Sequence, residues 1–228
     1  MKTVTRLFIY ISILLFTTVA VAQDAAPAPQ PSRPVPVEVF FGNDRVVTQI
    51  TLMKKFSGSN RFGLLASTYY AADYENELRN NESMNVLLLT YDIYKGLGVV
   101  SGAALNSKWG FRPFAGGMYS YGNRAFSTAF SSGFYLTESN NFESKGLVQY
   151  RHPLKDNWSL YTRLEGLFNL DMDTKKHDRG QLYGRLGVGY KAVGFGFATN
   201  LDWYGPNKVF KENYGVYVSY ALDRKSVV

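Results

Sequence analysis

Two arginines and a glutamate lie at positions that an extended strand would turn to its polar face. Arg163 and Glu165 are two residues apart in "NWSLYTRLEGLFNLDM", residues 157–172, and Arg185 lies in the similar stretch "QLYGRLGVGYK". In an extended strand, side chains two residues apart point to the same side. A row of arginines facing a confined space favours anions. Carboxylates such as Glu165 and Asp202 could instead neutralise these arginines, and the sequence leaves both interpretations open.

The elements that position these charges are predicted to be β-strands. In residues 157–172 every even position is apolar or small, as expected for a strand. Leu160, Leu164 and Phe168 would also fit one face of a helix, but Gly166 in the middle of the segment favours the strand. The same alternation recurs between turn-forming residues along the chain. The predicted blocks are 37–42, 46–56, 60–74, 84–94, 97–106, 111–121, 125–137, 145–152, 157–171, 180–191, 194–205 and 213–222. We therefore expect an all-β, antiparallel up-and-down barrel of about twelve strands, with ten as the alternative.

The two faces of these strands distinguish a membrane barrel from a soluble one. In "AFSTAFSSGFYLT" one face carries Phe126, Phe130 and Phe134, and the other is built from Ala, Ser and Gly. A soluble barrel turns its large apolar side chains inward, whereas a transmembrane barrel turns them toward lipid and keeps small or polar residues in the lumen. Short connections such as "KG" alternate along the chain with long ones such as "ENELRNNES", which is also typical of outer-membrane barrels. We predict a transmembrane barrel.

The last block, "NYGVYVSYAL", resembles the closing-strand signal that the outer-membrane assembly machinery recognises. The matching residues are Asn213, Gly215, Val218 and Tyr220, although the chain continues past Tyr220 where the family usually ends. With its strands and connections, residues 37–222 resemble a bacterial outer-membrane β-barrel, and in size and strand number the small monomeric porins. This resemblance implies a location in the outer membrane of a bacterium with two membranes, in a bilayer with lipopolysaccharide, with the assembly machinery as a partner. It favours a monomer and leaves the oligomeric state open.

The polar faces of the strands give the candidate lumen residues, and the aromatic residues near strand ends give a candidate girdle at the membrane interface. The lumen candidates are Arg151, Arg163, Glu165, Asn169, Gln181, Arg185, Lys191, Asn200 and Asp202. The girdle candidates are Trp109, Tyr119, Tyr121, Trp158, Trp203 and Tyr204.

The ends of the chain are predicted to lie outside the barrel. Residues 1–22 have the basic start, apolar run and Ala-x-Ala site of a signal peptide, with a membrane-anchor helix as the alternative. Residues 23–36 hold five of the eight prolines and are predicted to be a periplasmic spacer, and 223–228 a short tail. There is no cysteine for a disulfide or a lipid anchor. The basic residues are scattered, which excludes a nucleic-acid-binding face.

Catalytic residues, cofactors and bound metals are not expected. The two histidines, His152 and His177, have no serine neighbour on their own strands, and the acidic loop 171–178 lacks the glycine and glutamate of a calcium loop. The leading hypothesis is a narrow diffusion channel for small hydrophilic solutes, biased toward anions by Arg163 and Arg185. A closed structural or adhesive barrel acting through its external loops is the alternative, and an embedded lipid-modifying enzyme is the third.

Overall fold

The computed structural model describes residues 34–222 apart from 57, 60, 76 and 124, and these residues form one antiparallel β-sheet. The strands are β1 (Val35–Gly42), β2 (Arg45–Lys55), β3 (Phe62–Asp73), β4 (Glu82–Tyr94), β5 (Leu97–Asn106), β6 (Gly110–Gly122), β7 (Phe126–Tyr135), β8 (Phe142–Pro153), β9 (Trp158–Asp171), β10 (Lys176–Tyr190), β11 (Val193–Tyr204) and β12 (Val209–Leu222). The predicted signal peptide, nearly all of the predicted spacer and the tail lie outside the described residues. This described part contains no helix long and apolar enough to cross a membrane.

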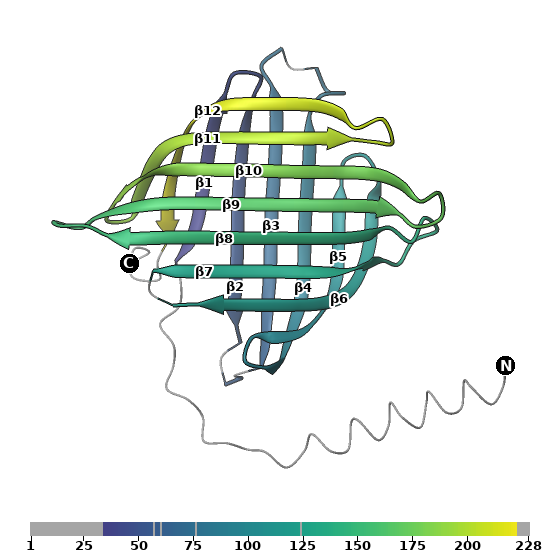
Figure 1. Ribbon diagram of the computed structural model, residues 1–228, viewed down its shortest axis with the longest axis horizontal. Helices are drawn as coiled ribbons and strands as arrows, with labels where there is room; N and C mark the ends of the chain where they lie inside the picture. The colour runs from purple at the N-terminus through teal and green to yellow at the C-terminus, as the bar shows by residue number, and fades with distance from the viewer. Residues whose placement is uncertain (1–33, 57, 60, 76, 124, 223–228) are drawn as a thin grey trace. The chain divides into compact units, whose positions relative to one another are not determined.

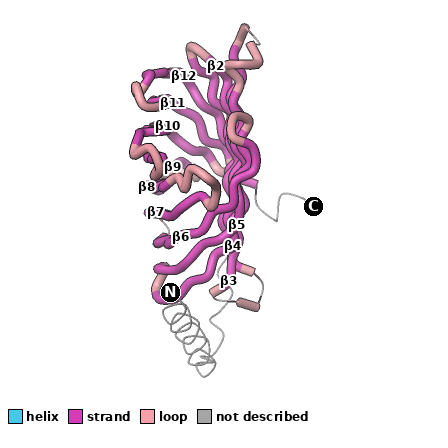
Figure 2. Tube along the Cα trace, turned by 90° about the vertical axis from the view of Figure 1, so that its right-hand side faces the viewer, coloured by secondary structure: helices cyan, strands magenta, loops and turns pink. Residues whose placement is uncertain are grey.

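The sheet closes on itself as an up-and-down barrel. Each strand pairs with the next along the chain, and β1 pairs with β12 from Val35 opposite Leu222 to Gly42 opposite Gly215. Figure 1 shows β6–β12 as one wall and β1–β5 behind them, and the view in Figure 2 shows the two walls facing one another. The predicted fold class, an all-β antiparallel barrel of twelve strands, is confirmed.

The alternation of side chains follows the prediction on β9. Leu160, Leu164 and Phe168 point outward and are exposed, whereas Tyr161 and Arg163 point inward and are buried. The outward side chains of the other strands are also mostly large and apolar, for example Phe130, Leu186 and Val216. A surface of this kind needs lipid around it, because apolar side chains exposed to water in such number are unfavourable.

Three strands begin at least three residues earlier than the sequence predicts: β8 at Phe142, β10 at Lys176 and β12 at Val209. The first residues of these strands, 142–144, 176–179 and 209–212, were assigned to loops. They form the ends of regular hairpins, as in the pairing of Lys211 with Asp202. We call one end of the barrel the mouth; its connections are 43–44, 74–81, 107–109, 136–141, 172–175 and 205–208. The opposite end, the base, holds Val35 and Leu222.

The seam between β1 and β12 depends on Gly215. A Cβ atom at this position would collide with the carbonyl oxygen of Phe41 on the neighbouring strand. We therefore expect Gly215→Ala to weaken the seam and lower the free energy of unfolding by about 1–3 kcal/mol, the usual range for overpacking. Urea unfolding of the refolded barrel in detergent micelles measures this change. Gly117→Ala is the matched control, because the nearest atom to its added Cβ is 3.9 Å away; equal losses in both variants would contradict this role of Gly215.

Candidate functional site

One group of polar side chains inside the barrel is built around Glu38 on β1. Glu38 Oε1 accepts hydrogen bonds from Arg163 Nη2 at 2.9 Å and from Arg185 Nε at 2.8 Å. Arg163 Nε is also 3.1 Å from Glu165 Oε1, and Gln49 donates to that carboxylate. We call Glu38, Gln49, Arg163, Glu165, Arg185 and Asn200 the Glu38 cluster. It joins β1 and β2 to β9, β10 and β11 across the interior.

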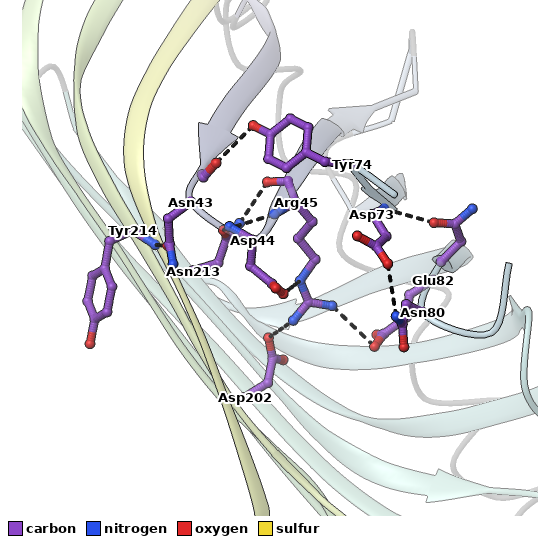
Figure 3. A network of polar contacts seen from close by, with 12 residues as sticks. Asn43, Asp44, Arg45, Asp73, Tyr74, Asn80, Glu82, Asp202, Asn213 and Tyr214 are labelled. Atoms are coloured by element: carbon purple, nitrogen blue, oxygen red, sulfur yellow. Dashed lines mark hydrogen bonds and ion pairs between the residues drawn. The ribbon is translucent and has the colours of Figure 1, made fainter. Parts of the chain in front are cut away.

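A second group, nearer the mouth, is built around Asp202 on β11. Arg45 of β2 donates to Asp202 Oδ2 at 3.3 Å and to Glu82 Oε1 at 3.4 Å, as Figure 3 shows. Arg179 Nη2 reaches the same two carboxylates, at 2.8 Å from Glu82 and 3.2 Å from Asp202. Tyr204 donates to Glu82 at 2.6 Å. We call Arg45, Glu82, Arg179, Gln181, Tyr183, Asp202 and Tyr204 the Asp202 cluster.

The charges within these two clusters balance. Their charged members are four arginines (Arg45, Arg163, Arg179 and Arg185) and four carboxylates (Glu38, Glu82, Glu165 and Asp202), and ion pairs of 3.4 Å or less connect them. All eight residues are at least nine-tenths buried. Buried charges are tolerated when they are paired and hydrogen-bonded in this way. The two clusters therefore add no net charge to the lumen.

The interior is packed more tightly on one side than on the other. Around the two clusters, inward side chains such as Phe40, Tyr217 and Asp202 have no exposed surface, so no water-sized space adjoins them. Some inward residues on β3 to β8, including Ser67, Ser131 and Lys145, are only half-buried. Space for water or a small solute therefore adjoins these residues, on the side of the interior that β3–β8 line.

Part of that side is apolar, which the sequence did not indicate. Leu88, Val100, Ala104, Phe114 and Tyr135 form a buried cluster on β4–β7. The partly buried Leu65, Met84, Val86 and Met118 pack against it. The prediction that the lumen face would be only small or polar is wrong for these strands. Strand β4 is apolar on both faces, so alternation cannot separate its inward side chains from its outward ones.

Most of the predicted lumen residues do lie inside the barrel. Arg163, Glu165, Arg185 and Asn200 belong to the Glu38 cluster, and Gln181 and Asp202 to the Asp202 cluster. Asn169 is buried and donates to Glu143 Oε2 at 2.9 Å, and Arg151 lies over the ring of Tyr161. Lys191 was placed wrongly: β10 ends at Tyr190, and Lys191 is exposed in the turn to β11 with a positive φ of 52°.

The girdle candidates separate into two groups. Trp109, Tyr119, Tyr121 and Trp158 are exposed, and Trp203 packs its ring against Phe210. Tyr204 is not a girdle residue, because it follows the outward Trp203 on β11 and so points inward, where it donates to Glu82. A girdle at the lipid interface stays a prediction for the other five.

The residues of the predicted assembly signal have separate structural positions. The Asn213 side chain is fully buried and accepts hydrogen bonds from the backbone N–H groups of Asp44 and Arg45. Val218 and Tyr220 are exposed on the outer face. Recognition of this strand by an assembly machinery stays a prediction.

The two histidines lie outside the clusters. His152 Nδ1 is 3.0 Å from the Tyr150 hydroxyl at the base, and His177 Nδ1 is 2.9 Å from the Gly205 carbonyl oxygen at the mouth. Within the described residues, no three His, Cys, Asp or Glu side chains are grouped as metal ligands would be.

Comparison with known proteins shows a relation of fold. No family model and no curated protein matches this sequence. A solved structure of the NanC porin superposes with a TM-score of 0.50 at 12% sequence identity, over 82% of this chain and 100% of that chain. The fold is that of a porin-like barrel.

Two further solved structures align with the porin-like barrel at lower TM-scores. The KdgM porin gives a TM-score of 0.46 at 14% identity, over 82% of this chain and 98% of that chain. OmpT of Vibrio cholerae lacking loop L8 gives 0.36 at 11% identity, over 82% and 97%. At such low sequence identity these similarities are similarities of fold, and they do not indicate which solute this protein would pass.

Proposed function

We propose that this porin-like barrel is a narrow diffusion channel for small hydrophilic solutes in a bacterial outer membrane. The observation that supports this proposal is the uneven packing of the interior. The Glu38 and Asp202 clusters fill one side of the lumen, and the half-buried Ser67, Ser131 and Lys145 lie on the side that β3–β8 line. The outward apolar side chains would face lipid, and the mouth would face the exterior, with both ends of the barrel sequence on the periplasmic side.

The ion preference of such a channel would depend on charges that are not already neutralised. Arg163 and Arg185, which the sequence suggested as selectivity residues, are both paired with Glu38. Lys145 on β8 points inward, is half-buried and has no ion pair within 4 Å in the described part of the chain. We therefore assign a preference for anions to Lys145, with Arg151 nearer the base.

Single-channel recording in a planar bilayer tests both parts of this proposal. The unmodified barrel is expected to give small, steady current steps and, in a salt gradient, a reversal potential on the anion side. Lys145→Glu is expected to lower the anion-to-cation ratio at least tenfold, because a change of two charge units at about 4 Å changes the energy of an ion in water by about 2 kcal/mol, and about 1.4 kcal/mol already corresponds to tenfold. The control is Lys155→Glu, which changes an exposed residue at the base. A silent unmodified barrel would overturn the channel function, and equal shifts in both variants would overturn the role of Lys145.

The alternative is a closed barrel with a structural or adhesive role. The complete burial of Phe40, Val47 and Tyr217 favours it, because these side chains leave no bore beside them. The short connections at the mouth oppose it, since several have two to four residues and offer little surface to a partner. This alternative predicts no current from a correctly folded barrel.

A further inference from the structure

Arg112, near the mouth end of β6, is a buried cation that no carboxylate neutralises directly. Its side chain points inward, because the preceding Phe111 is exposed on the outer face and Arg112 itself is 7% exposed. Within the part of the chain that the structure describes, no carboxylate lies within 4 Å of its guanidinium and no hydrogen bond reaches it. The other four buried arginines there all have ion pairs, in the Glu38 and Asp202 clusters. Since buried charges are normally paired, Arg112 lacks a partner.

Two aromatic rings hold Arg112 in place without satisfying its N–H groups. The central carbon of the guanidinium is 4.1 Å from the centre of the Tyr135 ring and 5.6 Å from the centre of the Trp109 ring. Such contacts use the positive charge of the guanidinium, whereas its five N–H groups need hydrogen-bond acceptors. The Tyr135 hydroxyl is directed elsewhere, since it donates to Glu143 at 3.1 Å. The side chain is therefore fixed in position while its donors are free.

The nitrogen atoms of Arg112 are within reach of a molecule that enters the mouth. Fully buried nitrogens without a partner occur in Arg45 and Arg179, but none belongs to Arg112. Because the Arg112 nitrogens also make no hydrogen bond, each of them keeps accessible surface. A guanidinium offers two parallel N–H groups that match the two oxygens of a carboxylate. Asp171 and Asp178 interact with Arg112 at longer range, and their charges favour a ligand that carries a single negative charge.

The inward side chains beside Arg112 are apolar. Arg112 pairs with Ala104 on β5, and Ala104 pairs with Val86 on β4, so the three inward residues form one row across three strands. Two strand spacings put Val86 about 10 Å from Arg112. Val86 and Met84 are only partly buried where they pack against the apolar cluster of β4–β7. A ligand that contacts both the free cation and this surface needs one charged end and an apolar body.

We propose that Arg112 binds the carboxylate of small monocarboxylic acids with an apolar body, such as aromatic carboxylates, at the mouth end of the lumen. The ligand carboxylate accepts hydrogen bonds from the guanidinium, and the apolar body lies toward Val86 and Met84. Anions with two negative charges bind more weakly, because Asp171 and Asp178 repel the second charge. The inference rests on the proposed function in one respect, since it names the class of solute that the channel would admit.

Ligand-detected NMR titration of the refolded barrel in detergent micelles tests this proposal without requiring conduction, with protein-free micelles as the background. The probes are benzoate, acetate, which lacks the ring, and benzamide, which lacks the charge. Benzoate is expected to bind at least ten times more tightly than either matched compound. Equal affinities for the three compounds, or no binding of benzoate, would overturn the proposal, because water alone would then satisfy the guanidinium.

Variants assign the binding to Arg112 and its apolar neighbours. Arg112→Met is expected to weaken benzoate binding at least tenfold, and Val86→Ser is expected to weaken the binding of benzoate but not that of acetate. The matched control is Arg79→Met, which removes an exposed arginine from the β3–β4 connection at the mouth and is expected to leave benzoate binding unchanged. Circular dichroism shows whether each variant keeps its β-structure. Unchanged benzoate binding in a folded Arg112→Met barrel would overturn the site.

Binding at Arg112 and conduction fail separately. The comparison of the three compounds uses the unmodified barrel, so it decides the proposal even if Arg112→Met does not fold. A barrel that binds benzoate but passes no current would retain the site and lose the channel. A barrel that conducts but does not bind benzoate would retain the channel and lose the site.

Discussion

Glu38→Gln is expected to lower the free energy of unfolding of the barrel by about 3–5 kcal/mol, the loss typical of removing one partner from a buried ion pair. The reason is geometric: Glu38 Oε1 is the shared acceptor of Arg163 and Arg185, both of which are buried. Glutamine keeps the shape of the side chain and removes its charge. Arg163 retains Glu165, but Arg185 is left with carbonyl and amide oxygens only. Equilibrium unfolding in urea with the barrel in micelles measures the loss.

The same substitution is expected to strengthen the anion preference of the channel, because one positive charge becomes uncompensated in the lumen. Glu212→Gln is the matched control, since it removes an exposed carboxylate and should change stability by less than about 0.5 kcal/mol. If both glutamine variants unfold at the same urea concentration, Glu38 does not hold the two walls together.

Asp202→Asn is expected to lower the free energy of unfolding by about 3 kcal/mol or more. The Asp202 side chain has no exposed surface and accepts hydrogen bonds from Arg45, Arg179, Gln181 and Tyr183. Asparagine offers one acceptor oxygen in place of two, and its amide group would face donors. Two buried arginines would then share Glu82 alone.

The control for this second prediction is Asp156→Asn, in an exposed turn at the base where φ is 56°, a conformation that asparagine tolerates well. Its unfolding midpoint is expected to match that of the unmodified barrel. An Asp202→Asn barrel as stable as the control would mean that the Asp202 cluster contributes little to closing the lumen.

Alternation was sufficient to predict the fold because most strands have one large apolar face. In "NWSLYTRLEGLFNLDM" the outward positions of Leu160, Leu164 and Phe168 and the inward position of Arg163 follow from the two-residue period alone. Strand starts were less predictable. Polar residues near the mouth, such as Lys211, have the composition of a loop and still continue the hydrogen-bonded hairpin.

The partners of the lumen arginines were not predicted, because each pair joins strands far apart in the sequence. Glu38 is 125 residues from Arg163, and no local pattern connects them. The sequence did contain a signal for the inward position of Glu38, because this single charged residue lies between Val37 and Val39, which point outward. Arg45 and Glu82 begin their strands and were assigned to turns, and Arg179 lies just before the predicted start of its strand.

The most direct test of the central claim, that ion pairs across the lumen narrow the channel, is the single-channel conductance of a Glu38→Ala/Arg185→Ala variant. This double substitution removes one negative and one positive charge, so it changes the bore while it keeps the charge balance. We predict larger current steps than in the unmodified barrel, with the ion preference unchanged. Current steps of the same size from a folded variant would contradict the claim.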